Sequence, residues 1–282
     1  MSPMNNRLLV PRQTPGLLDL VPGAAAAYSL RSLSNSYADP VVTVRRSSDD
    51  AEEGFTAAEV SDGTLAAFCG AGDGFVKTWH SQTGSNDATQ TTAGYQPKIV
   101  SSGVLILEEG KPAIQFDGSD DRLVATGYKP SGTICVFSVF TYSALDAVRL
   151  PFSCHKGGTP SGGFSFFNYT PGYTKIALQT GLGGVWVDGV NVLNAGDFDT
   201  DQSLVVIQIK PGSTSLRMRG VEIISESDGE IAAGNDLIVG GNANTPGLNS
   251  FVGTEQELII YPSDVSSQIE LLEGQIAWSY SQ

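Results

Sequence analysis

Short apolar runs separated by glycine-containing turns dominate this sequence and restrict it to a fold of many strands. The chain has 33 glycines in 282 residues, and only 16% of its residues are charged. The pairs DG, GG and PG stand between apolar runs such as TICVFSVFTY and SLVVIQIK. Glycine supplies the positive φ that tight turns between antiparallel strands require. The pattern therefore predicts an all-β domain, and the length suits a single core.

The apolar runs predict two series of strands, and many antiparallel strands with small marginal helices describe a two-sheet β-sandwich. The central strands should bury Ile134, Val136, Phe137, Val139, Val205, Ile207 and Ile209. The expected strands are residues 41–46, 75–79, 97–100, 104–107, 112–116, 133–142, 162–169, 173–180, 183–189, 203–210, 215–224, 236–241 and 256–262.

Helices are expected near both ends of the body. Apolar residues at helical spacing predict an amphipathic helix ending before Asp39–Pro40, with Ala26, Leu30, Leu33 and Tyr37 on one face. A second helix at the C-terminus, capped by Ser263 or Asp264, should share a face made of Val265, Ile269, Leu272 and Ile276.

Residues 1–23 are expected to form an extended anchoring arm, and residues 24–282 the body. The arm carries four prolines, which deny helix and sheet their hydrogen bonds. Such a segment has too little apolar surface to order itself. We predict that it docks on another subunit through its leucines and cations, with packing along its own body as the alternative. The predicted partner-binding residues are Arg7, Leu8, Leu9, Arg12, Leu17 and Leu18.

The charge balance excludes several classes of partner. Acidic residues outnumber basic ones 30 to 16, which gives a net charge of −14. Nucleic-acid backbones and anionic membrane surfaces would repel such a body. No stretch approaches the ~18 apolar residues of a membrane-spanning helix. We therefore expect neither a nucleic acid nor a membrane as partner.

The sequence indicates no cofactor. It has no phosphate-binding loop, dinucleotide fingerprint or nucleophile elbow. Its three cysteines lack metal or redox spacing, which mildly favours a reducing site of synthesis. Asp197, Asp199 and Asp201 alternate in GDFDTD as weak calcium candidates, but a solvated loop is the preferred interpretation. The same applies to the acidic stretch DGSDD at 117–121.

Three stretches resemble a known family. AYSLRSLSNSYADPVVTVRRSSDDAEEGF (27–55), TWHSQTGSNDATQ (78–90) and KPAIQFDGSDDRL (111–123) resemble, in this order, the opening of the α-L-arabinofuranosidase B catalytic domain. The same module is similar to concanavalin A-like or laminin G-like jelly rolls of bacteriophage structural proteins, where it often follows a segment like RLLVPR (7–12). The resemblance covers residues 24–125 well and implies a concanavalin A-like jelly roll.

The resemblance also implies where catalytic residues would stand. The family's general acid/base is the aspartate of a G-G-D-N-S-N-G turn, and Asn242 occupies that place in GGNANTPG. The nucleophilic glutamate ends an F-D-Y-G-N-A-E stretch, and Gly158 matches it in FSCHKGG. Ser81 replaces the aspartate of a third motif. Retaining glycosidases need two carboxylates about 5 Å apart. We therefore expect a chain with no catalytic residues that is not an enzyme.

Three functions follow as hypotheses. The first is a non-enzymatic structural component of a phage virion (capsid decoration, tail or fibre), made in the bacterial host cytoplasm and docked as an oligomer through its arm onto other virion proteins. The second is a carbohydrate-binding module for host-surface glycans. The third, least favoured, is an arabinofuranosidase-like glycosidase. Aromatic rings that could stack on sugars, although core packing is the commoner role, are Trp79, Tyr95, Tyr173 and Trp186.

Overall fold

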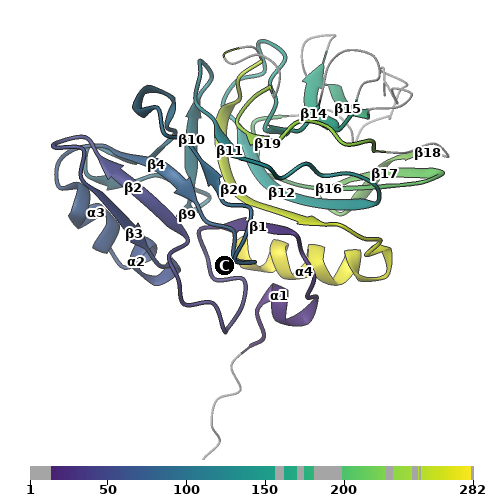
Figure 1. Ribbon diagram of the computed structural model, residues 1–282, viewed down its shortest axis with the longest axis horizontal. Helices are drawn as coiled ribbons and strands as arrows, with labels where there is room; N and C mark the ends of the chain where they lie inside the picture. The colour runs from purple at the N-terminus through teal and green to yellow at the C-terminus, as the bar shows by residue number, and fades with distance from the viewer. Residues whose placement is uncertain are drawn as a thin grey trace, which may run out of the picture.

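Two layers of antiparallel strands enclose one apolar core in the computed structural model, which describes residues 14–155, 162–169, 175–180, 199–226, 231–242, 247 and 249–280 (Figure 1). This arrangement confirms the predicted all-β sandwich with small helices at its margins and a helix at the C-terminus. None of the helices in these ranges is long and apolar enough to span a membrane.

The first layer consists of long strands arranged around β20. β20 pairs along one edge with β12, and along the other with β1 and β10, which lie end to end. β16, β17 and β18 continue the sheet beyond β12. The strands are β1 (Ala26–Ser29), β10 (Ile114–Asp117), β12 (Ile134–Tyr142), β16 (Ser203–Lys210), β17 (Ser213–Met218), β18 (Val221–Glu226) and β20 (Val252–Tyr261).

The second layer consists mainly of short strands in the order β5, β11, β19, β13, β14 and β15, all antiparallel. Its inward-facing residues at one level are apolar across four neighbouring strands, and each is almost completely buried: Leu123, Val239, Phe152 and Phe166. The strands are β5 (Ala88–Thr89), β11 (Leu123–Ala125), β13 (Phe152–Ser153), β14 (Phe164–Tyr169), β15 (Lys175–Thr180) and β19 (Leu237–Val239).

An N-terminal group of strands extends both layers at one side of the molecule, where α2 and α3 cover it (Figure 1). β4 pairs with β2, β5 and β6, and β6 in turn pairs with β10. The elements are β2 (Val42–Arg46), β3 (Glu52–Phe55), α2 (Ala57–Ser61), α3 (Thr64–Cys69), β4 (Gly74–Trp79), η1 (Ala93–Tyr95), β6 (Lys98–Ser101) and β7 (Val104–Leu105). β8 (Leu107–Glu108) and β9 (Lys111–Pro112) pair with each other as a separate two-stranded sheet.

The predicted core is confirmed. All seven residues named from the sequence are at most 2% exposed: Ile134, Val136, Phe137, Val139, Val205, Ile207 and Ile209. They lie on the paired strands β12 and β16, where Val136 is opposite Ile207 and Phe137 is opposite Val206. β12 is buried on both faces because α4 covers the face opposite the sandwich interior.

The helix predicted around residues 26–37 is wrong. Residues 26–29 form β1, which pairs with β20 so that Ala27 is opposite Ile259. A lone helix of three turns is marginal in water, and pairing with a free strand edge satisfies the same backbone groups while burying Tyr28 completely. Tertiary pairing overrides the helical spacing here.

The C-terminal helix is confirmed as α4 (Ile269–Tyr280), preceded by η2 (Ser266–Gln268). The four predicted residues of its inner face are all buried: Val265, Ile269, Leu272 and Ile276. α1 (Leu17–Leu20) contacts α4, as Figure 1 shows. Leu17 is buried in the apolar cluster beneath α4, so the second half of the predicted arm lies against its own body.

Two buried carboxyl groups on β20 face different surroundings. Glu257 accepts two hydrogen bonds from the Arg31 guanidinium, each 2.8 Å, and one from Ser29 Oγ. Glu255 accepts one from Ser138 Oγ at 2.6 Å, and its other oxygen has no hydrogen-bond partner within the described ranges. Burial raises the pKa of Glu255 well above its ordinary value. The buried surroundings of Glu255 therefore favour its protonated form.

Candidate functional site

The segments that resemble the family's two catalytic stretches lie next to each other. β13 pairs with β19, with Phe152 opposite Val239 and Ser153 opposite Ile238. Beyond β19, the Gly240 N–H donates to the Pro151 carbonyl at 2.7 Å. Ser153 Oγ donates to the Gly241 carbonyl at 3.2 Å. Asn242 therefore directly follows a turn that is fastened to β13, whereas Gly158 lies outside the described residues.

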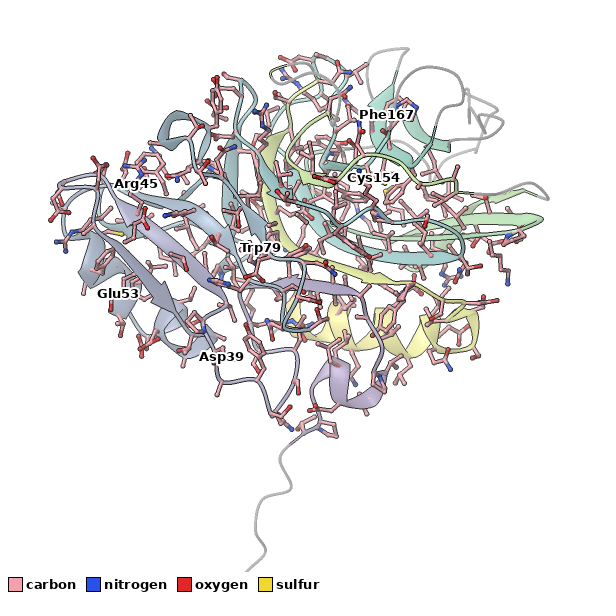
Figure 2. The ribbon with its side chains drawn as sticks, in the orientation of Figure 1. Asp39, Arg45, Glu53, Trp79, Cys154 and Phe167 are labelled. Atoms are coloured by element: carbon pink, nitrogen blue, oxygen red, sulfur yellow. The ribbon has the colours of Figure 1, made fainter. Side chains whose placement is uncertain are left out.

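Glycines allow three backbone segments to meet at Cys154, which follows β13 and is labelled in Figure 2. A Cβ added to Gly163 or Gly234 would lie 2.1 Å from the Cys154 carbonyl oxygen. Any side chain at either position would displace the backbone. The Cys154 carbonyl also accepts the Asn235 N–H at 2.8 Å. This packing fixes the end of β13 against the start of β19.

Polar side chains gather at that junction. Asn235 Nδ2 donates to the His155 carbonyl at 3.3 Å. His155 Nε2 is buried and has no hydrogen-bond partner within the described part of the chain. Burial lowers the pKa of His155, so its imidazole is neutral at pH 7. Asp236 lies 3.9 Å from Lys129 Nζ and keeps 29% of its side chain exposed. The junction thus offers an amide, an imidazole, a carboxylate and an ammonium.

An acidic group flanks the other end of β19. The Cβ position of Gly240 lies 3.0 Å from the Asp121 carbonyl oxygen, so Asp121 is next to the turn that leads to Asn242. The carboxylate oxygens of Asp117, Asp120 and Asp121 lie within 4.8 Å of one another. Burial, together with the charge of Asp117, raises the pKa of Asp121 to about 7. Asp121 can therefore release and recover a proton near neutral pH.

The solvated loop expected at DGSDD is thus more ordered than the sequence suggested. Asp121 Oδ2 accepts the Asp117 N–H at 3.0 Å, and Asp117 Oδ1 accepts the Ser119 N–H at 2.7 Å. Ser250 Oγ donates to the Ser119 carbonyl at 2.8 Å. Asp121 is 8% exposed, whereas Asp117 stays exposed.

The predicted glycan-stacking residues have different outcomes. Trp79 is fully buried, 5.6 Å from the Tyr28 ring, so it fills the core and cannot stack on a sugar (Figure 2). Tyr95 is partly buried, and the Arg122 guanidinium covers one face of its ring at 5.1 Å. Tyr173 and Trp186 lie outside the described residues. Neither Trp79 nor Tyr95 lies at the β13–β19 junction.

Two further predicted positions, Ser81 and Asp199, are bonded to other residues of the same chain. Ser81 is buried, where its Oγ accepts the Ala27 N–H at 3.0 Å and its own N–H donates to Asp87 Oδ1. Asp199 binds the Arg219 guanidinium with both carboxylate oxygens, so a cation of the chain occupies this calcium candidate.

The predicted arm residues and the other calcium candidates lie partly outside the described residues. Asp197 lies outside the described residues, as do Arg7, Leu8, Leu9 and Arg12. Asp201 is exposed. Leu17 is buried by its own body, and Leu18 packs partly against the same cluster. A contact between the arm and another chain stays a prediction.

Sequence reasoning missed the role of His155, Asn235 and Lys129. The adjacency of Cys154 and His155 predicts a purely structural pair, and the strand expected at 236–241 begins at Asp236 without including Asn235. The available signal was the stretch Gly234–Asn235–Asp236 immediately before an apolar strand, because glycine there admits a close backbone approach. The partner segment is 80 residues away from Asn235 and could not be identified from local pattern.

Comparison with solved structures finds the same fold in carbohydrate-active enzymes. A GH54 α-L-arabinofuranosidase soaked with a cyclic sulfate inhibitor matches over 90% of this chain, with a TM-score of 0.65 and 16% identity. An arabinofuranosidase complexed with arabinofuranosyl-α-1,2-xylobiose matches over the same share, with a TM-score of 0.62 and 15% identity. Trypanosoma rangeli sialidase in complex with sialic acid matches over 71%, with a TM-score of 0.50 and 12% identity, and 31% of that chain is covered.

This chain spans 62% of the length of the two arabinofuranosidases. Comparison with models of protein families and with curated proteins found no match. The structural matches correct one expectation from the sequence: that the chain is not an enzyme is contradicted, because nine-tenths of it adopts the fold of GH54 arabinofuranosidases. These carbohydrate-active neighbours give no support to a phage origin or a virion role.

Proposed function

We propose that this chain binds a glycan carrying an arabinofuranosyl unit, at the junction of β13 and β19. The observation that carries the proposal is the pairing of these two strands, which brings together the two stretches that resemble the catalytic segments of arabinofuranosidases. The fold likeness supports it, since one of the matched enzymes is complexed with arabinofuranosyl-α-1,2-xylobiose.

The side chains at the junction suit sugar hydroxyls. Sugars are held by a few well-placed donors and acceptors on a rigid scaffold. Asp236 supplies an acceptor, and Lys129 supplies a donor. The neutral His155 ring lies behind these groups, because its Nε2 is buried. Glycine packing around Cys154 fixes the backbone that carries these groups.

The two ends of β19 would contact different parts of one ligand. Four residue steps separate Asp236 from Gly240, which is roughly 13 Å of extended chain. That span exceeds one sugar ring. An oligosaccharide lying along β19 would therefore meet Asp236 at one end and the Asp121 carboxyl near the other.

Hydrolysis of the bound glycoside is the second candidate function, and Asp121 favours it. A carboxyl with a pKa of about 7 can act as general acid near neutral pH. The neighbouring oxygens of Asp117 and Asp120 lie within 4.8 Å, close to the spacing of about 5 Å in retaining glycosidases. These carboxylates lie beside the turn that leads to Asn242. Any hydrolysis would therefore use an acid at a different position from the aspartate that Asn242 replaces.

Binding is tested by titrating arabinofuranosyl-α-1,2-xylobiose into the full chain in a calorimeter. We expect measurable binding, at least about 10-fold weaker for Asp236→Asn because one charged acceptor is lost. Asp39→Asn, an exposed acid on another face (Figure 2), should bind like the natural chain. Equal affinity for Asp236→Asn and the natural chain would exclude this junction, and a natural chain without affinity would refute the proposed function.

Hydrolysis is tested separately with an aryl arabinofuranoside. Turnover above buffer that falls at least about 100-fold in Asp121→Asn, and persists in Asp39→Asn, would establish Asp121 as the acid. Turnover that survives in Asp121→Asn would exclude that role.

A place in a phage particle, predicted from the sequence, stays a prediction. Particles purified from an infected host and separated from lysate by density would carry this chain in a fixed stoichiometry if it is a virion component. Its presence only in the soluble fraction would count against that location.

A further inference from the structure

A histidine in the N-terminal group of strands joins a hydroxyl to a carboxylate. His80 Nε2 lies 2.8 Å from Thr43 Oγ1, and His80 Nδ1 lies 2.8 Å from Asp87 Oδ2. Thr43 is on β2, His80 directly follows β4, and Asp87 directly precedes β5. A hydroxyl, an imidazole and a carboxylate in this order, each within hydrogen-bond reach of the next, form the arrangement that activates a nucleophile in hydrolases.

The proton of the neutral imidazole lies on the nitrogen that faces Asp87. Burial raises the pKa of Asp87, but hydrogen bonds from His80 and from the Ser81 N–H outweigh burial, so this pKa is below its ordinary value. The carboxylate is therefore ionised at neutral pH and can only accept, so Nδ1–H donates to it. Nε2 then carries a lone pair that accepts the Thr43 Oγ1–H. The ring is thus oriented to take the hydroxyl proton.

The segment that carries Asp87 is fixed by the fold. Asp87 Oδ1 accepts the Ser81 N–H at 2.9 Å. Asn86, with a φ of +65°, donates from Nδ2 to the Ala25 carbonyl at 2.8 Å, and its own carbonyl accepts the Tyr28 hydroxyl. Hydrogen bonds of this kind keep a base and its nucleophile aligned before a substrate arrives.

A substrate can reach the hydroxyl and the imidazole. Thr43 is partly buried, and His80 keeps 25% of its side chain exposed. Gly54 on β3 is opposite Thr43. A Cβ added to Gly54 would lie 3.0 Å from Pro40 Cγ and 3.8 Å from Thr43 Oγ1. A larger side chain at this position would crowd the hydroxyl, whereas glycine keeps the β3 side of it uncovered.

A second hydroxyl lies beside the first. Thr78 on β4 is directly opposite Thr43. Side chains at opposite positions share a face, with Cβ atoms about 5 Å apart. Thr78 Oγ1 also lies 3.4 Å from Thr89 Oγ1 on β5, which is a long contact. The Thr78 hydroxyl can therefore donate to the oxygen on which negative charge develops when a carbonyl beside Thr43 is attacked.

This cluster is separate from the β13–β19 junction. The row of opposite residues that begins at Thr43 and Thr78 continues through Thr89 and Val124 to Ile238 on β19. Four strand spacings, roughly 19 Å, separate Thr43 from Ile238 along this row. A group that reacts at Thr43 would therefore not contact the side chains of the junction.

The charges around the cluster favour a neutral substrate. Burial, together with the charges of Asp39 and Asp87, raises the pKa of the neighbouring Tyr37 to about 12. The Lys77 ammonium on β4 is paired with Glu52 at 2.6 Å. Acids thus outnumber unpaired cations here, and an anionic substrate would be repelled.

We propose that Thr43, His80 and Asp87 form a catalytic site that hydrolyses a neutral carboxylic ester. Thr43 Oγ1 forms a bond to the carbonyl carbon while its proton passes to His80 Nε2. The bond between that carbon and the alcohol oxygen then breaks, and the alcohol leaves with the proton from His80. Water cleaves the acyl–Thr43 ester by the same route, which releases the carboxylic acid and returns a proton to Thr43. Asp87 touches no reacting atom and is a positioning residue for the imidazole.

Hydrolysis of p-nitrophenyl acetate by the full chain tests the site. We expect release of p-nitrophenol above buffer, at least about 100-fold slower in Thr43→Val, which keeps the shape of the side chain and loses the hydroxyl. Thr43→Ser keeps a hydroxyl and should stay within about 10-fold of the natural chain. Thr91→Val changes an exposed threonine outside the site and should leave the rate unchanged.

Two further measurements separate catalysis from a structural role of these bonds. Rapid acid quenching should trap an acetyl group on Thr43, found by mass spectrometry in the tryptic peptide of residues 32–45. Asp87→Asn should lower kcat at least about 100-fold and change KM less than about 3-fold, because the wrong nitrogen of the imidazole would then carry the proton.

A natural chain that releases p-nitrophenol no faster than buffer would refute the proposal, as would unchanged turnover in Thr43→Val. Acetyl groups found only on lysines would also refute it, because the ester would then be modifying the surface without catalysis. These outcomes are independent of glycan binding, which the calorimetric titration measures with a different ligand.

Discussion

The first layer, built of long strands around β20 (the long-strand sheet), excludes water mainly with large side chains. The second layer, built mainly of short strands (the short-strand layer), also does so by close contact between backbone segments. β12, β16 and β20 bury large side chains along eight to ten residues each. β13 and β19 contain two and three residues, and around them backbone contacts backbone through Gly163 and Gly234. The first region buries apolar side chains along its whole length, and the second also holds polar groups at fixed positions. Stability and the candidate site therefore reside in different layers.

The largest effect should come from the long-strand sheet. Phe137 is fully buried, and its ring meets Tyr261 edge-on at 6.2 Å. Phe137→Ala should lower the free energy of unfolding by about 3–5 kcal/mol through lost burial and a cavity. Chemical denaturation measures it, with the exposed Leu107→Ala as control. A melting temperature equal to that of the natural chain would contradict the role given to this sheet.

The short-strand layer should respond to added atoms instead. Gly163 has φ +74°, and a Cβ there would lie 2.1 Å from the Cys154 carbonyl oxygen. Gly163→Ala should cost about 1–3 kcal/mol and also weaken glycan binding, because the junction must open. Gly127→Ala is a matched control, since it has φ +85° and open space around its Cβ. Equal losses in the two variants would mean that the close approach at Cys154 contributes nothing.

The same contrast explains what the sequence could predict. Apolar runs mark long strands, so β12 and β16 were expected within one residue, whereas β20 begins at Val252, four residues before the expected strand at 256–262. The pattern around Ala26 and Leu30 predicted a helix because spacing cannot show that the edge of β20 is free to pair. The position of the candidate site followed from the family resemblance. Its polar members did not, because His155 and Asn235 meet through a contact between segments 80 residues apart.

Titration of Asp121 sharpens the comparison at the boundary of the two layers. Its pKa in the folded chain is about 7, raised from 3.8, so the folded state prefers the protonated acid. Its contribution to stability is complete below pH 3.8 and is lost as pH rises through about 7. Asp121→Asn should therefore be more stable than the natural chain at pH 8, on the order of 1 kcal/mol, after the weaker bond to the Asp117 N–H is counted.

Thermal unfolding from pH 4 to 8 measures this difference. The two proteins should converge as pH falls, and Asp39→Asn should follow the natural chain at every pH. A difference between Asp121→Asn and the natural chain that is the same at pH 4 and pH 8 would show that Asp121 is ionised throughout. The acid role considered for it would then have no basis.

The smallest effect on stability should come from the junction itself. Lys129 and Asp236 lie 3.9 Å apart with 53% and 29% of their side chains exposed, and such pairs contribute about 0–1 kcal/mol. Lys129→Met should therefore melt within a few degrees of the natural chain. Its affinity for the arabinofuranosyl glycan should nevertheless fall about 3- to 10-fold, because a donor to sugar hydroxyls is lost while the aliphatic stem is kept. Lys77→Met is the control, since Lys77 is also a partly exposed lysine paired with a carboxylate, Glu52, outside the junction. If both variants bound the glycan like the natural chain, the junction would be an ordinary surface ion pair. A loss of binding confined to Lys129→Met, without loss of stability, would show that the junction contributes to glycan binding and not to the stability of the fold.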